Sequence, residues 1–313
     1  MKILVTGGLG FIGSHLSESL LLEKHNVIIL TRNLKSKSKI IKQLPKAKIE
    51  QVDITDFKKF SKILKKYKPD VIFHLAGETS HKNSFKDPMY DVEVNAKSTL
   101  CILETIKNFF PKCRLIVGST FIVIGKPKKL PVTESSNCNP TTIYGANRLT
   151  SEYFCKIYHN VYGLDTLVFR ITNCFGPREQ YKTPNKNALN YLIYQSYKNQ
   201  KITIYNQGKF FRDVIFITDV ISGLMIILTK GKSGELYWIS SDKKTWFYNI
   251  GKYLKNLTNT NVLYENPPSY STKVDVGNFV ADNSKLKSLG WDLKISVKDG
   301  IQQTLNYFKI NSL

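Results

Sequence analysis

Two segments of the chain carry side chains that together can move a proton. Tyr144 and Arg148 stand four residues apart in a stretch with helical spacing, so they share one helix face. Ser119 and Thr120 close an apolar run farther upstream. A phenol beside a cation can act as a base because the cation stabilises the phenolate, while a hydroxyl holds the substrate group that loses its proton. This set of residues suits the oxidation of an alcohol by hydride transfer.

A glycine-rich segment follows the first apolar run of the chain. The run Lys2–Thr6 leads into Gly7-Gly8-Leu9-Gly10-Phe11-Ile12-Gly13, and the amphipathic stretch Ser14–Lys24 comes next. Glycines at this spacing between a strand and a helix let backbone N–H groups approach a pyrophosphate at the helix N-terminus. The segment therefore predicts a dinucleotide cofactor.

The residues after the second predicted strand bear on the choice of cofactor. A carboxylate at this place usually binds the ribose hydroxyls of NAD. Here Val27–Leu30 is followed by Thr31, Arg32 and Asn33, with no acid. Arg32 can meet the 2′-phosphate of NADP, whereas a hydrogen bond from Thr31 or Asn33 to the ribose serves NAD. We predict NAD or NADP, with a slight preference for NADP.

Short apolar runs alternate with longer amphipathic ones in the first half of the chain, which predicts an α/β fold with a doubly wound parallel sheet. The predicted strands are Lys2–Thr6, Val27–Leu30, Ile49–Val52, Val71–Leu75, Leu115–Gly118 and Thr166–Ile171. The predicted helices are Ser14–Lys24, Lys58–Tyr67, Asp91–Asn108 and Thr142–Tyr162. Ligands bind at the carboxyl ends of such strands, where Asp53 is placed to meet the adenine amino group.

The pattern changes after Asn173. The stretch Gly176–Asn187 reads as a loop, and Ile202–Tyr205 and Val214–Phe216 read as short strands. Ile217–Leu228 reads as a helix that returns to the main layer. We predict a dinucleotide-binding domain from residues 1–173 plus about 214–232. A smaller α/β substrate-binding region, 174–213 plus about 233–313, is expected over the carboxyl edge of the sheet.

Composition excludes several classes of protein. The 46 basic residues against 24 acidic ones are spread over the whole chain, and the dense stretch 35–48 has no aromatics to stack on bases. We therefore expect no nucleic-acid partner, although a positive field suits a polyanionic small substrate. No apolar run approaches a membrane span and no signal peptide is visible, so a soluble cytoplasmic protein is expected. Scattered cysteines and histidines fit no metal site.

Nine short motifs point to one family. They are Thr6 to Gly13, Asp53-Ile54-Thr55-Asp56, His74-Leu75-Ala76-Gly77, Asn95 with Thr99-Leu100, Ser119-Thr120 with Gly125, Tyr144 to Arg148, Arg170 to Pro177, Phe211-Arg212-Asp213 and Leu289-Gly290-Trp291. With these motifs essentially the whole chain resembles an extended short-chain dehydrogenase/reductase of the NAD-dependent epimerase/dehydratase family. Such enzymes have a Rossmann-type sheet and act on nucleotide-diphosphate sugars.

The resemblance implies roles for individual residues. The catalytic residues are Thr120, Tyr144 and Arg148. The cofactor-binding residues that it implies are Gly7, Gly10, Phe11, Ile12, Gly13, Asp53, Ile54, Leu75, Ala76, Gly77, Asn95 and Tyr144, with Arg148 in place of the family's lysine. Thr31 and Arg32 are added as cofactor-binding candidates from the residues after the second strand. Asn173 and Arg212 are implied to contact the diphosphate of the substrate. Ser119 and Thr120 are expected to meet the sugar from the strand end, and Ser84 either touches its hydroxyls or caps a turn. Arg178 and Lys273 are further candidates for substrate binding. The helices 91–108 and 142–162 are expected to form a homodimer interface.

The sequence departs from the family pattern at three places. Arg148 stands where the family has a catalytic lysine, and its longer, planar group is expected to alter the cofactor geometry. Thr120 is followed by Phe121 and Ile122 rather than by the Asp-Glu pair that 4,6-dehydratases use, so dehydration is not expected. A C-terminal arginine of the family is also missing, and Lys273 or Arg178 is expected to meet the phosphates instead.

These residues together predict an NAD(P)-dependent enzyme that oxidises C4 of a nucleotide-diphosphate hexose or heptose in surface-polysaccharide synthesis. Release of the 4-keto sugar gives a dehydrogenase, and return of the hydride to the other face gives a 4-epimerase. A 4-keto sugar reductase is a further alternative, as is a dinucleotide-binding regulator weakened by Arg148. The sugar and the nucleotide base are left open.

Overall fold

The central element is a seven-stranded sheet in which every neighbouring pair of strands is parallel. The computed structural model describes residues 1–34, 38–183, 187–268 and 274–312. The strand order is β11-β6-β5-β4-β1-β2-β3. The strands are β1 Lys2–Thr6, β2 Asn26–Thr31, β3 Lys48–Gln51, β4 Val71–His74, β5 Arg114–Thr120, β6 Thr166–Ile171 and β11 Leu236–Ile239.

Helices cover both faces of the sheet, and each face has its own core. Side chains alternate along β1, so Ile3 and Val5 pack on one face while Leu4 packs on the other. The first face is covered by α1 (Phe11–Leu22) and α9 (Ile217–Lys230), which contact each other. The second is covered by α3 (Phe57–Tyr67), α6 (Ser98–Phe109) and α7 (Ile143–Tyr162). The predicted doubly wound, Rossmann-type α/β fold is therefore confirmed.

The long helix predicted over 91–108 has different bounds in the structure. Asp87 caps a helix that starts at Pro88, by accepting a hydrogen bond from the Tyr90 backbone N–H at 3.0 Å. This helix, α5 (Pro88–Val92), continues through the π-helical turn η2 (Glu93–Lys97) into α6. The predicted start at Asp91 is wrong because the cap and the proline lie upstream. Strand β5 also runs two residues beyond its predicted end, to Thr120.

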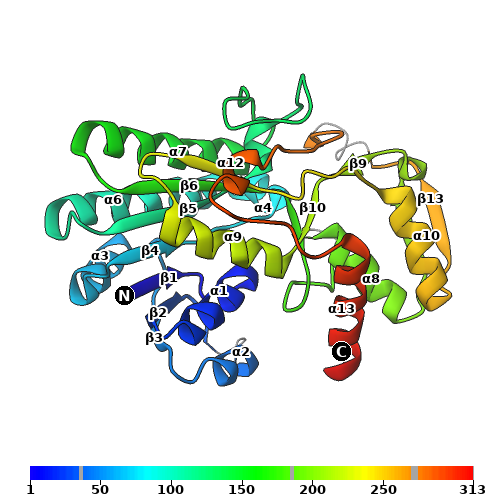
Figure 1. Cartoon of the computed structure of the whole chain (residues 1–313), viewed down its shortest axis with the longest axis horizontal. Coiled ribbons are helices and arrows are strands. Elements are labelled where there is room, and N and C mark those ends of the chain that lie inside the picture. Colours follow the sequence, from blue (N-terminus) through cyan, green and yellow to red (C-terminus); the bar gives the residue numbers. More distant parts are fainter. Residues whose placement is uncertain (35–37, 184–186, 269–273, 313) are drawn as a thin grey trace.

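The remaining elements gather at the other end of the molecule. Figure 1 shows α8, α10, α13 and β13 together on the right, away from the seven-stranded sheet. The short paired strands are β7 (Asn173–Phe175) with β10 (Val214–Phe216), β8 (Ile202–Tyr205) with β13 (Val262–Glu265), and β9 (Phe211–Arg212) with β12 (Thr245–Trp246). The helices here are α8 (Ala188–Tyr197), α10 (Phe247–Thr258) and α13 (Val297–Ile310), and the sequence did not predict α8 or β7.

Short helices complete the fold. They are α2 (Ser38–Gln43), α4 (His81–Lys86), α12 (Ser284–Lys287), η3 (Phe121–Ile124) and η4 (Asn206–Gly208). In the described part of the chain, no helix combines the length and the apolar character that crossing a bilayer requires.

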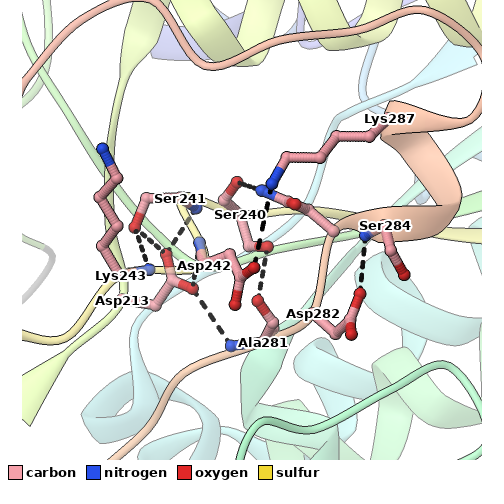
Figure 2. Close-up of polar contacts among 10 residues, drawn as sticks. Asp213, Ser240, Ser241, Asp242, Lys243, Ala281, Asp282, Ser284 and Lys287 are labelled. Atoms are coloured by element: carbon pink, nitrogen blue, oxygen red, sulfur yellow. Dashed lines mark hydrogen bonds and ion pairs between the residues drawn. The ribbon is translucent and has the colours of Figure 1, made fainter.

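A buried carboxylate ties the second half of the chain together. Asp213 lies between β9 and β10 and is fully buried. It accepts hydrogen bonds from the Ser241 N–H (2.7 Å), the Ser241 hydroxyl (2.8 Å) and the Ala281 N–H (3.1 Å), as Figure 2 shows. The Thr172 hydroxyl and the Asp242 N–H also donate to it, at 3.0 and 3.2 Å. Burial raises the pKa of Asp213 to about 6, while these hydrogen bonds act to lower it.

Candidate active site

A cavity of about 770 Å³ opens at the carboxyl ends of the strands, where β1 and β4 are neighbours. The strand order reverses at this point of the sheet, which is where α/β folds of this kind bind ligands. The predicted residues that line the cavity are Gly7, Gly10, Phe11, Ile12, Gly13, Thr31, Arg32, Asp53, Ile54, Leu75, Ala76, Gly77, Ser119, Tyr144, Arg148 and Arg178. Residues from distant parts of the sequence therefore meet in one place.

The glycine segment forms a tight turn into α1. The Gly10 N–H donates to the Gly7 carbonyl at 2.8 Å, and Gly10 caps the helix without a side-chain hydrogen bond. The first N–H groups of α1 therefore keep their donors for an anion. A Cβ on Gly13 would lie 2.2 Å from the Gly7 oxygen, so the helix can approach the turn this closely only with glycine at that position. This arrangement fits a dinucleotide pyrophosphate.

One end of the cavity carries the residues predicted to meet the adenosine. The Arg32 guanidinium donates to the Tyr90 hydroxyl and lies 4.0 Å from one Asp53 carboxylate oxygen. The other Asp53 oxygen accepts from the Thr55 N–H at 3.0 Å. Asp56, not Asp53, caps the N-terminus of α3, so the Asp53 carboxylate is not used to cap this helix. Arg32 has a 64% exposed side chain, so its outer face is open to solvent.

A neutral histidine supports the end of β4. The Thr6 hydroxyl oxygen accepts from the Leu75 and Ala76 N–H groups, each at 3.1 Å. His74 hydrogen-bonds the same hydroxyl at 2.8 Å and the Ser98 hydroxyl at 3.1 Å. Burial lowers the pKa of His74 to about 3, with the Arg148 charge as a smaller cause. The fully buried imidazole therefore fixes the turn after β4 and stays uncharged.

The predicted base and its cation share the first turns of α7. Thr142 caps this helix by accepting a hydrogen bond from the Gly145 N–H at 3.0 Å. The central carbon of the Arg148 guanidinium lies 5.8 Å from the centre of the Tyr144 ring, and both side chains are largely buried. The His81 ring meets Tyr144 edge to face, with centroids 5.7 Å apart. Burial lowers the pKa of His81, so the positive charge beside the phenol comes from Arg148.

Ser119 and Thr120 end β5, but they face different partners. Ser119 lines the cavity and donates its hydroxyl proton to Glu152. Glu152 in turn accepts two hydrogen bonds from Arg170, at 3.0 and 2.7 Å. The Thr120 hydroxyl oxygen accepts from the Ile122 N–H at 3.3 Å and caps the short helix η3. Ser119 therefore lines the cavity, whereas Thr120, the predicted catalytic hydroxyl, is not among the lining residues.

Sequence reasoning missed Glu152, although a signal was present. Tyr144, Arg148 and Glu152 follow one another at intervals of four residues, which is the spacing of one helix face. A carboxylate on the buried face of this helix needs a cation, and Arg170 supplies it from β6. Other polar lining residues that were missed are Glu78, Thr79, Tyr90, Glu179, Gln180, Tyr181 and Lys182.

The predicted substrate residues are more scattered. Arg178 lines the cavity and forms an ion pair of 2.7 Å with Glu18 of α1. Arg212 is paired with Asp275 and also donates to the Gly277 carbonyl. Asn173 donates to the Asp213 carbonyl at 3.0 Å. Neither Arg212 nor Asn173 is among the lining residues of the cavity.

Three further predictions have other outcomes. Ser84 is fully buried and donates to the His81 carbonyl at 2.8 Å, away from the cavity wall. Asn95 is fully buried behind Gly77 and donates to the Glu78 carbonyl at 3.0 Å. Lys273 lies outside the described residues.

The fold and the cavity at its strand ends are those of a Rossmann-type α/β protein. A family model described as GDP-mannose 4,6 dehydratase matches residues 4–304. The chain belongs to this family, within the extended short-chain dehydrogenases/reductases that act on nucleotide sugars as epimerases and dehydratases. It is an enzyme of this family.

Individual proteins support the assignment. A putative UDP-glucose 4-epimerase of Methanocaldococcus jannaschii is 30% identical, covering 99% of each chain. The structure of Thermotoga maritima UDP-glucose 4-epimerase with UDP-glucose matches with a TM-score of 0.91, at 28% identity and covering 100% of both chains. Bacillus cereus UDP-glucuronic acid 4-epimerase, in complex with UDP-glucuronic acid and NAD, matches with a TM-score of 0.86, at 28% identity and covering 99% of this chain and 100% of that one. Proteins named as 4,6-dehydratases also occur among the relatives.

Proposed function

We propose that the enzyme oxidises C4 of a nucleotide-diphosphate sugar and either re-reduces it to the 4-epimer or releases the 4-keto sugar. The observation that carries this proposal is the position of Tyr144. Its ring lies beside the Arg148 charge in the same cavity that the glycine turn of α1 lines. Reversible alcohol oxidation requires a base, a cation that stabilises it and a bound dinucleotide, and one cavity can supply all three.

The chain's own residues have separate tasks in this reaction. Thr120 holds the C4 hydroxyl of the sugar and Tyr144 removes its proton. The Arg148 charge stabilises the Tyr144 phenolate, which is the form of the side chain that accepts the proton. The nicotinamide, when bound, supplies the hydride chemistry. The glycine turn, Asp53 and the main chain after β4 would hold the dinucleotide.

Dehydration is not part of the proposal. Removal of water from neighbouring carbons needs an acid and a base, and the family's 4,6-dehydratases carry them as an Asp-Glu pair directly after the catalytic threonine. Phe121 and Ile122 occupy those places, and Ile122 is buried in the apolar cluster that also contains Tyr144. Neither side chain can donate or accept a proton.

The cofactor is proposed to be NAD or NADP, and Arg32 is the residue that favours NADP. Its exposed guanidinium can receive a 2′-phosphate, but the Asp53 carboxylate 4.0 Å away opposes a second negative charge there. Calorimetric affinities for NAD and NADP decide between the two. Tighter binding of NADP supports the role of Arg32, and tighter binding of NAD removes it.

We also propose a homodimer through α6 and α7. Tyr153, Ile157 and Val161 follow one another at intervals of four residues on α7 and are exposed by 56%, 49% and 65%. An apolar stripe of this kind on a helix face is typical of a surface covered by a partner. Phe109 at the end of α6 is 50% exposed as well. Light scattering should give twice the mass of the chain, and a monomer at micromolar concentration would remove the proposal.

The proposed reaction is tested with NAD or NADP and a panel of UDP-, GDP-, dTDP- and CDP-sugars. Absorbance of reduced nicotinamide detects a released 4-keto sugar, and chromatography of the sugars detects a 4-epimer. Tyr144→Phe should lower turnover by about a hundredfold or more and leave cofactor affinity unchanged, because only the proton acceptor is lost. Full activity in this variant would show that another group is the base.

A further inference from the structure

Gly77 lies three residues after the end of β4. The space that a side chain at this position would take is occupied by another residue. A Cβ built on Gly77 would lie 1.8 Å from the Arg148 Nη2 atom and 2.9 Å from the Arg148 Cζ atom. The backbone of Gly77 is outside the left-handed region, so its conformation alone does not require glycine. The requirement is steric, and it is imposed by the guanidinium.

Arg148 uses this space to reach the ends of two strands. Its Nη1 donates to the Gly118 carbonyl of β5 at 3.2 Å, and its Nη2 approaches the Ala76 carbonyl after β4 at 3.5 Å. The Nε atom is buried without a hydrogen-bond partner in the described part of the protein. The side chain is only 4% exposed and lines the cavity. The charge is therefore held in a fixed place before any ligand arrives.

We infer that Gly77 is a positioning residue: the absence of its Cβ seats the Arg148 guanidinium between the Ala76 and Gly118 carbonyls, at the place from which it acts on Tyr144. This inference rests on the proposed function, since Arg148 matters through the base it accompanies. It explains how a planar group that is longer than an ammonium fits at this point of the site. Arginine at 148 and glycine at 77 form one unit.

A methyl group at Gly77 should therefore lower activity and change stability little. The atoms that meet the added methyl are at the far end of a flexible side chain, so Arg148 can swing away. When it moves, the charge leaves its place beside the Tyr144 ring and intrudes on the cavity. Asn95 Oδ1 would lie 2.6 Å from the same methyl, so a smaller part of the effect does not depend on Arg148.

Four proteins test the pairing: the natural chain, Gly77→Ala, Arg148→Lys, and the double variant. Turnover and cofactor affinity are measured for each, with the melting temperature as a check of folding. Gly77→Ala should lower kcat about tenfold or more in the natural background, because it displaces the charge. Lysine has no second terminal nitrogen to collide with the methyl, so the same change should cost less than about threefold in the Arg148→Lys background.

Gly223→Ala in α9 is the matched control. Its Cβ would meet only side chains, at 3.3 Å or more, and it should leave kcat and cofactor affinity unchanged. Equal losses from Gly77→Ala in the natural chain and in the Arg148→Lys variant would overturn the pairing. If no sugar nucleotide is turned over, the proposed function fails. The four proteins are then compared by their cofactor affinities alone. Non-additive affinities then support the pairing, and additive ones overturn it.

Discussion

The residues proposed to hold the cofactor and those predicted to hold the substrate, here called the cofactor half and the substrate half of the site, differ in the partners of their polar groups. On the cofactor side, the N-terminal N–H groups of α1 lack a side-chain cap, and Arg148 keeps its buried Nε unpaired within the described residues. On the side of the predicted substrate residues, Arg212 and Asn173 already bond to other parts of the protein. Under the proposed function, the turn of α1 and Arg148 are formed in advance, whereas Arg212 and Asn173 would exchange internal partners for the ligand.

Arg212 shows what that exchange involves. Its side chain is 12% exposed and its guanidinium is held by the Asp275 carboxylate and the Gly277 carbonyl. A diphosphate that replaces Asp275 gives the arginine a stronger bidentate acceptor without leaving a buried charge unpaired. Asp275 has a 45% exposed side chain, so it can turn to solvent at small cost. If Arg212 binds the substrate diphosphate, as the resemblance implies, this pair keeps its charge satisfied until the ligand arrives.

The largest effect should come from a change in the cofactor half. Gly13→Ala places a methyl group 2.2 Å from the Gly7 oxygen, and 2.8 Å from the Gly8 Cα, so backbone must move. We expect cofactor affinity to fall about a hundredfold or more, because the displaced N–H groups are those proposed to meet the pyrophosphate. Calorimetry with NAD or NADP measures it, with Gly223→Ala as the control glycine. Retained affinity would show that this turn adapts to the ligand and is not formed in advance.

A smaller effect is expected in the substrate half. Arg212→Met should raise the KM for the sugar nucleotide about tenfold and leave cofactor affinity unchanged, since one charge-assisted contact to the diphosphate is lost. Initial rates at saturating cofactor give the KM. An altered cofactor affinity would instead place Arg212 in the other half of the site.

Asp275→Asn examines the partner of the same arginine. If Asp275 only occupies Arg212 in the absence of substrate, its amide variant should bind the diphosphate slightly better, and the KM should fall about two- to fivefold. If Asp275 instead holds Arg212 in its working position, the KM should rise as it does in Arg212→Met. A rise would mean that the substrate half is also formed in advance.

The sequence predicted the positions of the cofactor-half elements more accurately than those of the substrate half, and the reason is physical. Strand alternation and the Gly7 to Gly13 spacing are local patterns, and they placed the turn of α1 and the end of β5 to within a few residues. Pairings between distant residues leave no such pattern. The ion pair of Arg212 with Asp275 spans 63 positions and the hydrogen bond of Ser119 to Glu152 spans 33. The π-helical turn that buries Asn95 was equally invisible, because it inserts one residue into an otherwise regular helix.

The last effect is on stability, not on binding, and it concerns Asp213, the buried carboxylate beside Arg212. Burial raises the pKa of Asp213 to about 6 from an ordinary value of 3.8, so the folded protein binds this proton more tightly than the unfolded chain. The stability contributed by that proton is fully present below about pH 4, and it is lost as the pH rises through about 6. The loss amounts to about 3 kcal/mol. Asp213→Asn cannot titrate, so the difference in melting temperature between the natural chain and this variant should shrink from about pH 4 to about pH 7.

Asp282, in the same cluster of polar contacts, provides a control of opposite sign (Figure 2). The Ser284 side chain and N–H hold the pKa of Asp282 below its ordinary value, so its contribution is lost as the pH falls. The difference between the natural chain and Asp282→Asn should therefore grow from about pH 4 to about pH 7. A constant difference for Asp213→Asn over this range would mean that the hydrogen bonds to Asp213 outweigh its burial. Strand β9, which carries Arg212 next to Asp213, would then be anchored by a permanent charge.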